Sequence, residues 1–248
     1  MHEQEWDQVA TTFEEEIFNV PANDHKGLIT EAVERFASRD AVATDLGCGV
    51  GRTLPLLAGH FGRVYAVDVS SACLAVAEEA CGAHANIRYV HADLSKDRKG
   101  YPQGDLVLCI NTWLNADAAM RAGIVRNTCQ SVKRGGHLVL VVPALGSALL
   151  STLRQVQLNQ RMGMDPAKAE RKALPEGNGW AHGIVPIDGV PTKHFMAEEL
   201  QALLAERGFV VEAVEKLEYG WDTEFIDPPA WMSAPYPWDW FLVARRVR

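Results

Sequence analysis

The chain has 248 residues, of which 48% are hydrophobic and 23% charged, the balance of a soluble globular protein with material for one large α/β core. Its formal net charge of −8 disfavours a general binder of nucleic-acid phosphates, which needs clustered lysine and arginine. The longest apolar run, at 138–145, is interrupted by Pro143 and is far too short to span a membrane.

The cysteines also narrow the class of protein. The chain has five, at Cys48, Cys73, Cys81, Cys109 and Cys129. Because their number is odd and no CxxC pair occurs, a disulfide framework and a zinc knuckle are both disfavoured. The N-terminus is acidic and lacks the apolar segment of a signal peptide. We therefore expect a cytoplasmic protein with reduced cysteines and no metal site.

The first half of the chain predicts a helical start and then alternating strands and helices. Residues 6–20 have the pattern of an amphipathic helix, with Trp6 and Phe13 on its packing face, and a second helix follows a cap at Asn23 or Asp24. Short β-branched runs predict strands at 41–46, 64–69, 87–92, 105–110 and 137–142. Helices are expected between them at 51–60, 71–81 and 116–134. This alternation is typical of a doubly wound α/β sheet.

The regularity changes after Pro143. A helix is predicted at 147–162, and residues 163–195 are rich in glycine and proline with little periodicity. A helix at 197–207 and strands at 209–217 and 238–246 complete the chain.

The stretch "DLGCGVG", residues 45–51, places a glycine-rich turn between a predicted strand and a predicted helix. Such a turn brings free backbone N–H groups and the positive end of a helix next to a ligand. Asp68 ends the next strand, where a carboxylate can accept both hydroxyls of a ribose, and Asp93 follows the third strand. The spacing fits a nucleoside that lies across the strand ends.

Two cofactors suit this arrangement, and charge favours one of them. A dinucleotide fold prefers a third glycine at position 52, where this chain has Arg52. Asp45, two residues before Gly47, would repel a pyrophosphate but suits a cofactor with an ammonium group.

The motif "DLGCGVG" resembles the first motif of class I S-adenosylmethionine-dependent methyltransferases. The stretches "VDVS", "HADL", "DLVLCINTWLN" and "VKRGGHLVLVVP" resemble the family's later motifs in the same order, and the segment that begins "TKHFMAEEL" is similar to its last helix and sixth strand. The resemblance implies a Rossmann-like sheet of seven strands, mostly parallel with an antiparallel last strand, and helices on both faces.

The same resemblance implies a single methyltransferase domain over 1–248. Its parts would be an N-terminal helical lid (1–38), a cofactor-binding core (39–145), an inserted substrate cap (146–195), and a C-terminal helix with the last two strands (196–248).

The resemblance also implies which residues hold S-adenosylmethionine. Asp45 and the turn of Gly47, Cys48, Gly49 and Gly51 would hold the methionine portion, with Cys48 as a small side chain rather than a nucleophile. Asp68 would bind the ribose hydroxyls, with Val69 beside the adenine. Asp93 and the Leu94 N–H would bind the adenine amino group, and Ile110 and Asn111 would pass next to the sulfonium.

The acceptor side of the site is less defined by the sequence. Tryptophans are the candidate substrate contacts: Trp113, Trp180, Trp221 and Trp231. No catalytic base is identified, and His25, His182 and His194 are only weak candidates because they lie in the least regular segments.

We expect O- or N-methylation of a small molecule by in-line displacement, with S-adenosylhomocysteine as product and no nucleic-acid or membrane partner. The chain would act as a monomer or a homodimer. Two alternatives remain open: an NAD-dependent oxidoreductase and a non-catalytic S-adenosylmethionine-binding module.

Overall fold

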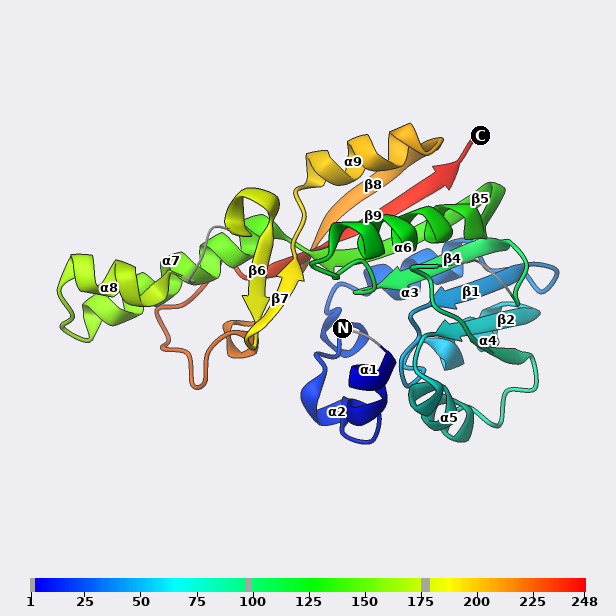
Figure 1. Cartoon of the computed structure of the whole chain (residues 1–248), viewed down its shortest axis with the longest axis horizontal. Helices are drawn as coiled ribbons and strands as arrows, with labels where there is room; N and C mark the ends of the chain where they lie inside the picture. The colour runs from blue at the N-terminus through cyan, green and yellow to red at the C-terminus, as the bar shows by residue number, and fades with distance from the viewer. Residues whose placement is uncertain (1–2, 97–99, 175–178) are drawn as a thin grey trace.

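The fold is taken from a computed structural model, which describes residues 3–96, 100–174 and 179–248. Seven strands form one sheet in the order β3-β2-β1-β4-β5-β9-β8 (Figure 1). The strands span β1 (Val42–Leu46), β2 (Arg63–Asp68), β3 (Ile87–His91), β4 (Gly104–Ile110), β5 (Val132–Pro143), β8 (Phe209–Glu218) and β9 (Trp238–Arg246). β1 to β5 pair in parallel, whereas β9 is antiparallel to both of its neighbours. This confirms the predicted fold class.

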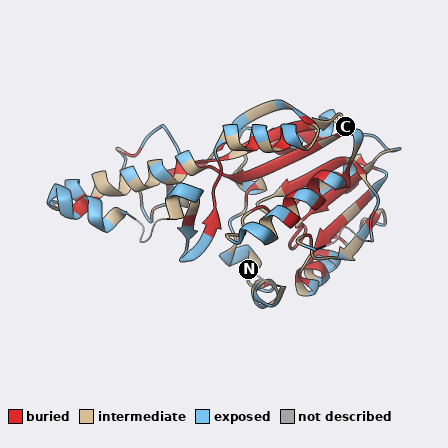
Figure 2. Ribbon diagram, turned by 45° about the horizontal axis from the view of Figure 1, so that its top comes forward, coloured by how far each residue is buried: buried red, intermediate tan, exposed pale blue. Residues whose placement is uncertain are grey.

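Helices cover both faces of the sheet because each buries one apolar stripe against it. The helices α3 (Leu28–Arg35), α4 (Leu54–His60) and α5 (Ser71–Ala80) pack on one face. The helices α6 (Ala118–Ser131) and α9 (Ala197–Glu206) pack on the other face. Figure 2 shows the strands buried between these helices, whose outer surfaces are exposed. The predicted helices and strands of this core are confirmed to within a few residues at their ends.

The N-terminal segment differs from its prediction. It forms two short helices, α1 (Glu3–Val9) and α2 (Phe13–Glu16), instead of one helix over 6–20, followed by the 3-10 turn η1 (Pro21–Asn23). The Asp24 carboxylate accepts a hydrogen bond from the Ile29 N–H, 2.7 Å, at the start of α3. Asp24 therefore supplies the predicted cap, although the residue that directly precedes α3 is Gly27.

The segment after β5 begins with the helix predicted at 147–162, and the described part of 163–195 has more regular structure than its composition indicated. The long helix α7 (Leu145–Arg161) and α8 (Pro166–Ala173) form an arm that extends away from the sheet in Figure 1. The 3-10 turn η2 (Gly179–His182) leads into a small hairpin of β6 (Ile184–Ile187) and β7 (Val190–Lys193). The predicted irregular stretch at 163–195 thus contains a helix and a hairpin, and η3 (Trp221–Thr223) lies between β8 and β9.

All five cysteines are buried and unpaired. Among the described helices, none has the length and apolar character that crossing a membrane demands.

Candidate functional site

The parallel strands end at one edge of the sheet, and the predicted cofactor residues lie there because each closes a strand or opens the following turn. The turn after β1 folds back onto β2: the Gly47 N–H donates to the Val67 carbonyl, 2.7 Å. Gly47, Gly49 and Gly51 have φ angles of 74°, 52° and 88°, which side chains larger than hydrogen rarely adopt. The glycines are therefore required by the backbone of the turn.

Two neighbouring groups fill the space that side chains would take. A Cβ on Gly47 would collide with the Thr112 hydroxyl, and a Cβ on Gly49 would lie 2.7 Å from the Phe13 ring. Thr112 follows β4, and its hydroxyl donates to the Leu46 carbonyl, 2.9 Å. The turn is thus held between the end of β4 and helix α2, and the predicted packing face of the N-terminal segment meets it through Phe13.

Asp68 connects β2 to the glycine turn. Its carboxylate accepts hydrogen bonds from the Gly49 N–H and the Ser70 N–H, each at 2.8 Å. Only 8% of the residue is exposed, and burial raises its pKa above the ordinary value of 3.8. The two backbone hydrogen bonds therefore fix the orientation of the Asp68 carboxylate at the end of β2, where the ribose hydroxyls are predicted to bind.

Asp45 is a second buried carboxylate behind the same turn. It is 3% exposed and accepts a hydrogen bond from the Thr53 hydroxyl. Burial raises the pKa of Asp45 to about 7. The hydrogen bond from Thr53 lowers this pKa, and the nearby charge of Asp68 raises it further. Among the described residues, no lysine or arginine forms an ion pair with Asp45 or Asp68.

The remaining predicted cofactor residues lie along the same edge. Val69 follows β2, and its carbonyl accepts a hydrogen bond from His91, 2.9 Å. Asp93 follows β3, but its carboxylate accepts from the Ser95 N–H at 2.9 Å and pairs with Lys96 at 3.0 Å. Asp93 thus caps its own turn, and Leu94 is buried next to it.

Asn111 follows Ile110, the last residue of β4, and has a φ of 48°. Its amide nitrogen lies 3.5 Å from a carboxylate oxygen of Asp239, and its buried side-chain oxygen has no hydrogen-bond partner.

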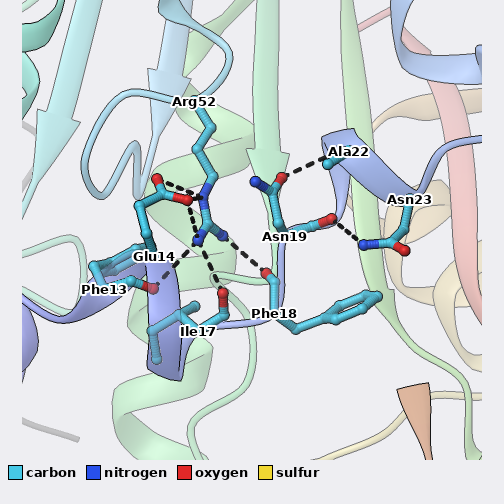
Figure 3. Close-up of polar contacts among 8 residues, drawn as sticks. All are labelled: Phe13, Glu14, Ile17, Phe18, Asn19, Ala22, Asn23 and Arg52. Carbon is cyan, nitrogen blue, oxygen red and sulfur yellow. Dashed lines mark hydrogen bonds and ion pairs between the residues drawn. The ribbon is translucent and has the colours of Figure 1, made fainter. Parts of the chain in front are cut away.

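The N-terminal helices are attached to the site by Arg52, the residue that replaces the third glycine (Figure 3). The guanidinium pairs with Glu14 at 3.0 Å and donates to the carbonyls of Phe13, Ile17 and Phe18 at 2.9–3.2 Å. Ile17 and Phe18 directly follow α2, where the chain leaves the helix, whereas the Phe13 carbonyl also accepts from the Ile17 N–H at 3.0 Å. The sequence singled out Arg52 as a departure from a dinucleotide motif but did not indicate this contact.

A second attachment joins α1 to α5. Ser70 is the predicted N-cap of α5, and its hydroxyl accepts from the Cys73 N–H, 3.0 Å. The same hydroxyl donates to Asp7 of α1, 2.6 Å, and Asp7 also accepts from the Ala72 N–H at 3.2 Å. The N-terminal helices therefore lie over the glycine turn and the start of α5.

We expect Arg52→Ala to release these helices. The substitution removes hydrogen bonds to three carbonyls and one carboxylate, so residues 3–20 should exchange their amide hydrogens at least several-fold faster. Hydrogen-exchange mass spectrometry measures this. Arg39→Ala is the matched control, because Arg39 also donates to two carbonyls, those of Ala58 and Gly59, but does not contact α1 or α2. Unchanged exchange in Arg52→Ala would contradict the attachment.

Burial contradicts two of the four predicted tryptophan contacts, those of Trp113 and Trp221, and the other two stay predictions. Trp113 is fully buried under α6 and its indole N–H donates to Thr128, 3.1 Å, so it is a core residue with no surface for a substrate. Trp221 is 2% exposed and is covered by Arg154, whose guanidinium carbon is 5.5 Å from the ring centroid. The guanidinium carbon of Arg161 lies 4.2 Å from the centroid of the Trp231 ring. The chain's own arginines therefore occupy ring faces that the sequence offered to a substrate. Trp180 is half-buried in η2.

The three candidate histidines do not converge on one point. His25 is exposed before α3. His182 is exposed and lines a hollow of about 400 Å³ together with Arg121, Lys193 and Glu199, which includes no residue of the glycine turn. His194 is 6% exposed, and burial lowers its pKa while its Nδ1 lies 3.1 Å from the Thr192 carbonyl. No group of three potential metal ligands occurs within the described part of the chain.

Comparison with known proteins supports the assignment of the fold. Residues 43–136 match a family model described as a methyltransferase domain. No curated protein sequence matches the chain.

Among solved structures, a complex of DhpI with SAM and HEP is 15% identical, with a TM-score of 0.63 over 98% of this chain and 94% of the other. The N-methyltransferase NodS from Bradyrhizobium japonicum, in complex with S-adenosylhomocysteine, is 14% identical, with a TM-score of 0.62 over 99% and 98%. The magnesium protoporphyrin IX methyltransferase of Synechocystis, also with bound SAH, is 15% identical, with a TM-score of 0.54 over 98% and 94%. Residues 43–136 therefore match a methyltransferase domain, and the chain as a whole has the fold of solved S-adenosylmethionine-dependent methyltransferases.

Proposed function

We propose that the chain transfers the methyl group of S-adenosylmethionine to a small-molecule acceptor, at oxygen or nitrogen. The observation that carries the proposal is the pair of buried carboxylates, Asp45 and Asp68, next to a glycine turn without a basic partner among the described residues. A cofactor with an ammonium and a sulfonium group would offset this buried negative charge, whereas a pyrophosphate would add to it.

The residues present fit this cofactor. The backbone of the glycine turn would hold the methionine portion, and the Asp68 carboxylate can accept hydrogen bonds from ribose hydroxyls in addition to its two backbone donors. Asp93 and Leu94 would border the adenine. When bound, the cofactor supplies a methyl group activated by a positively charged sulfur.

The chain's own contribution is alignment and exclusion of water. Methyl transfer is an in-line displacement, so a fixed approach of the acceptor accounts for much of its rate. The Phe13 ring against Gly49 and the attachments of Arg52 and Asp7 would keep water from the turn. We propose that residues 1–38 serve as a lid and that the segment 146–195 borders the acceptor.

Similar structures do not identify the acceptor. NodS is named as an N-methyltransferase and the Synechocystis protein as a magnesium protoporphyrin IX methyltransferase, yet both resemble this chain over nearly its whole length. Fold similarity at this identity therefore leaves the acceptor to be argued from the site itself.

The NAD-dependent oxidoreductase is the weaker alternative. Arg52, the one basic side chain within the turn, makes its hydrogen bonds to α2 and the residues after it and is not free to bind a phosphate.

Isothermal titration with S-adenosylhomocysteine and with NAD tests this choice. We expect S-adenosylhomocysteine to bind and NAD not to compete. Tight NAD binding without S-adenosylhomocysteine binding would overturn the proposal.

Incubation with methyl-labelled S-adenosylmethionine and a small-metabolite extract tests turnover. A labelled small molecule is the expected product. Cofactor binding without any labelled product in such extracts would favour the non-catalytic binding module.

A further inference from the structure

A third buried carboxylate, Asp239, lies at the same edge of the sheet as the glycine turn. β9 is antiparallel to β5, so its first residues lie at the end of β5, and Asp239 is opposite Pro143, the last residue of that strand. Asp239 is 8% exposed, and the strand around it, "WDWFLVA", is otherwise apolar. An acid in such a strand is costly unless a partner offsets its charge.

Among the described residues, no lysine or arginine forms an ion pair with the Asp239 carboxylate. One carboxylate oxygen accepts a hydrogen bond from the Tyr219 hydroxyl, 2.8 Å, and lies 3.5 Å from the amide nitrogen of Asn111. No hydrogen bond from the described residues reaches its other oxygen. The charge is therefore held by neutral groups alone.

Asn111 connects this carboxylate to the cofactor side of the site. A carboxylate can only accept, so the amide nitrogen of Asn111 must face Asp239, and its oxygen then lacks a donor. The residue also has a left-handed backbone (φ 48°), and the next residue, Thr112, contacts Gly47. Tyr219 contacts the N-terminal segment: its ring packs edge-on against the Phe18 ring, with 4.7 Å between the ring centroids. The cluster of Asn111, Tyr219 and Asp239 thus lies between the glycine turn and the N-terminal segment.

We propose that this cluster binds the acceptor, and that the acceptor is an amine whose nitrogen is methylated. A protonated amino group would donate to Asp239 and to the free oxygen of Asn111, satisfying both acceptors and the unpaired charge together. Tyr219 positions Asp239 by holding one of its oxygens. A neutral hydroxyl has one proton to donate, so it would satisfy only one of the two acceptors and would leave the charge unpaired, which is why the arrangement favours an amine.

The proton balance of the reaction follows from the same contacts. One proton of the ammonium passes to the Asp239 carboxylate, which frees the nitrogen lone pair. That pair forms the bond from nitrogen to the methyl carbon as the bond from sulfur to carbon breaks, and sulfur keeps the electrons of the broken bond. The proton then leaves Asp239 for water. Burial raises the pKa of Asp239 to about 6, which suits a group that takes up and releases a proton near neutral pH.

The test is a binding measurement, and it rests on the proposed function only through the cofactor. A panel of primary arylalkyl and alkyl amines, each paired with its hydroxyl counterpart, is titrated into the protein saturated with S-adenosylhomocysteine. We expect at least one amine to bind roughly tenfold or more tightly than its alcohol at pH 7.5, the size of one charge-assisted hydrogen bond. Asp239→Asn should abolish this preference while the dissociation constant for S-adenosylhomocysteine stays within about twofold of wild type.

Two further variants keep the test decisive. Asp222→Asn, the same substitution at an exposed carboxylate of η3, is the matched control and should leave the preference intact. If Asp239→Asn does not fold, Asn111→Gly removes the free oxygen with a residue that tolerates a positive φ, and it should reduce the preference at least several-fold.

The pH dependence supplies a separate readout. Amine binding should weaken as the pH falls through about 6, because Asp239 is then protonated. Other groups face or border this carboxyl: Tyr219, Glu224, whose charge also raises the pKa of Asp239, and Lys216, whose ammonium lies 3.6 Å from the centroid of the adjacent Trp238 ring. Tyr219→Phe removes a hydrogen bond that favours the ionised form, so the pH of half-maximal amine binding should rise.

Each outcome decides the inference. No amine preferred over its alcohol, or a preference that survives in Asp239→Asn, would overturn the amine assignment while the cofactor assignment stands. Failure of S-adenosylhomocysteine to bind wild type would instead overturn the proposed function.

Discussion

Asp68→Ala is expected to weaken the binding of S-adenosylhomocysteine at least tenfold, or about 1.4 kcal/mol. The carboxylate lies at the end of β2 and is aimed by the N–H groups of Gly49 and Ser70, both at 2.8 Å. Two ribose hydroxyls donating to an ionised carboxylate would each be worth about 1.5–3 kcal/mol, so the minimum expected loss is a conservative one. Isothermal titration calorimetry at pH 8 measures the change.

The alanine variant also leaves two buried N–H groups without acceptors, which can disturb the turn. Asp68→Asn separates the two effects: the amide oxygen can still accept from one backbone donor, but the charge is lost. We expect this variant to bind more tightly than Asp68→Ala and more weakly than wild type.

Asp105→Ala is the control for a lost carboxylate at the opposite end of the sheet, where Asp105 accepts from the Val42 N–H at 2.8 Å and pairs with Lys133. Its dissociation constant should match wild type. An unchanged constant in Asp68→Ala would show that the ribose lies elsewhere.

The core of the fold and the position of the turn could be predicted because both are local in sequence. Short apolar runs identified the strands, and the glycines had to follow the first of them because the turn requires positive φ at Gly47, Gly49 and Gly51. In parallel strands the chain direction alone brings the strand ends to one edge, so Asp45 and Asp68 were placed near each other without knowledge of contacts.

The acceptor side could not be predicted, because its contacts join residues far apart in the sequence. Asn111 and Asp239 are 128 positions apart, and no periodic pattern links them. The only local signal for Asp239 was an acid within an apolar strand. For Trp113 the sequence offered a large aromatic side chain but not its direction, and packing under α6 decided against a ligand contact.

Residues 163–195 are predicted as irregular because glycine and proline suppress periodicity. In the structure, Pro166 begins α8, where it needs no N–H partner, and Gly189 with φ 79° lies in the turn of the β6-β7 hairpin. The same residues that read as breakers therefore mark the boundaries of regular elements.

The ligand-free chain is expected to become more stable as the pH falls from 8 to 5, and Asp45→Asn should remove much of that gain. Burial raises the pKa of Asp45 from 3.8 to about 7, so between these values the folded protein holds a proton that the unfolded chain has released. The stabilisation is complete below about pH 4 and is lost as the pH rises through about 7. From pH 8 to 5 this group alone contributes about 2–3 kcal/mol to the free energy of unfolding.

Urea unfolding of wild type and Asp45→Asn at both pH values isolates Asp45, because the raised pKa values of Asp68 and Asp239 and the lowered pKa of His194 are common to both proteins. The asparagine oxygen can still accept from Thr53, so the variant should be the more stable protein at pH 8. Asp40→Asn, an exposed carboxyl just before β1, is the matched control and should follow wild type. Equal pH dependence in wild type and Asp45→Asn would contradict a buried charge at position 45. Saturation with S-adenosylmethionine should flatten the wild-type pH dependence, because a bound cation would stabilise the ionised carboxylate and keep it unprotonated at lower pH.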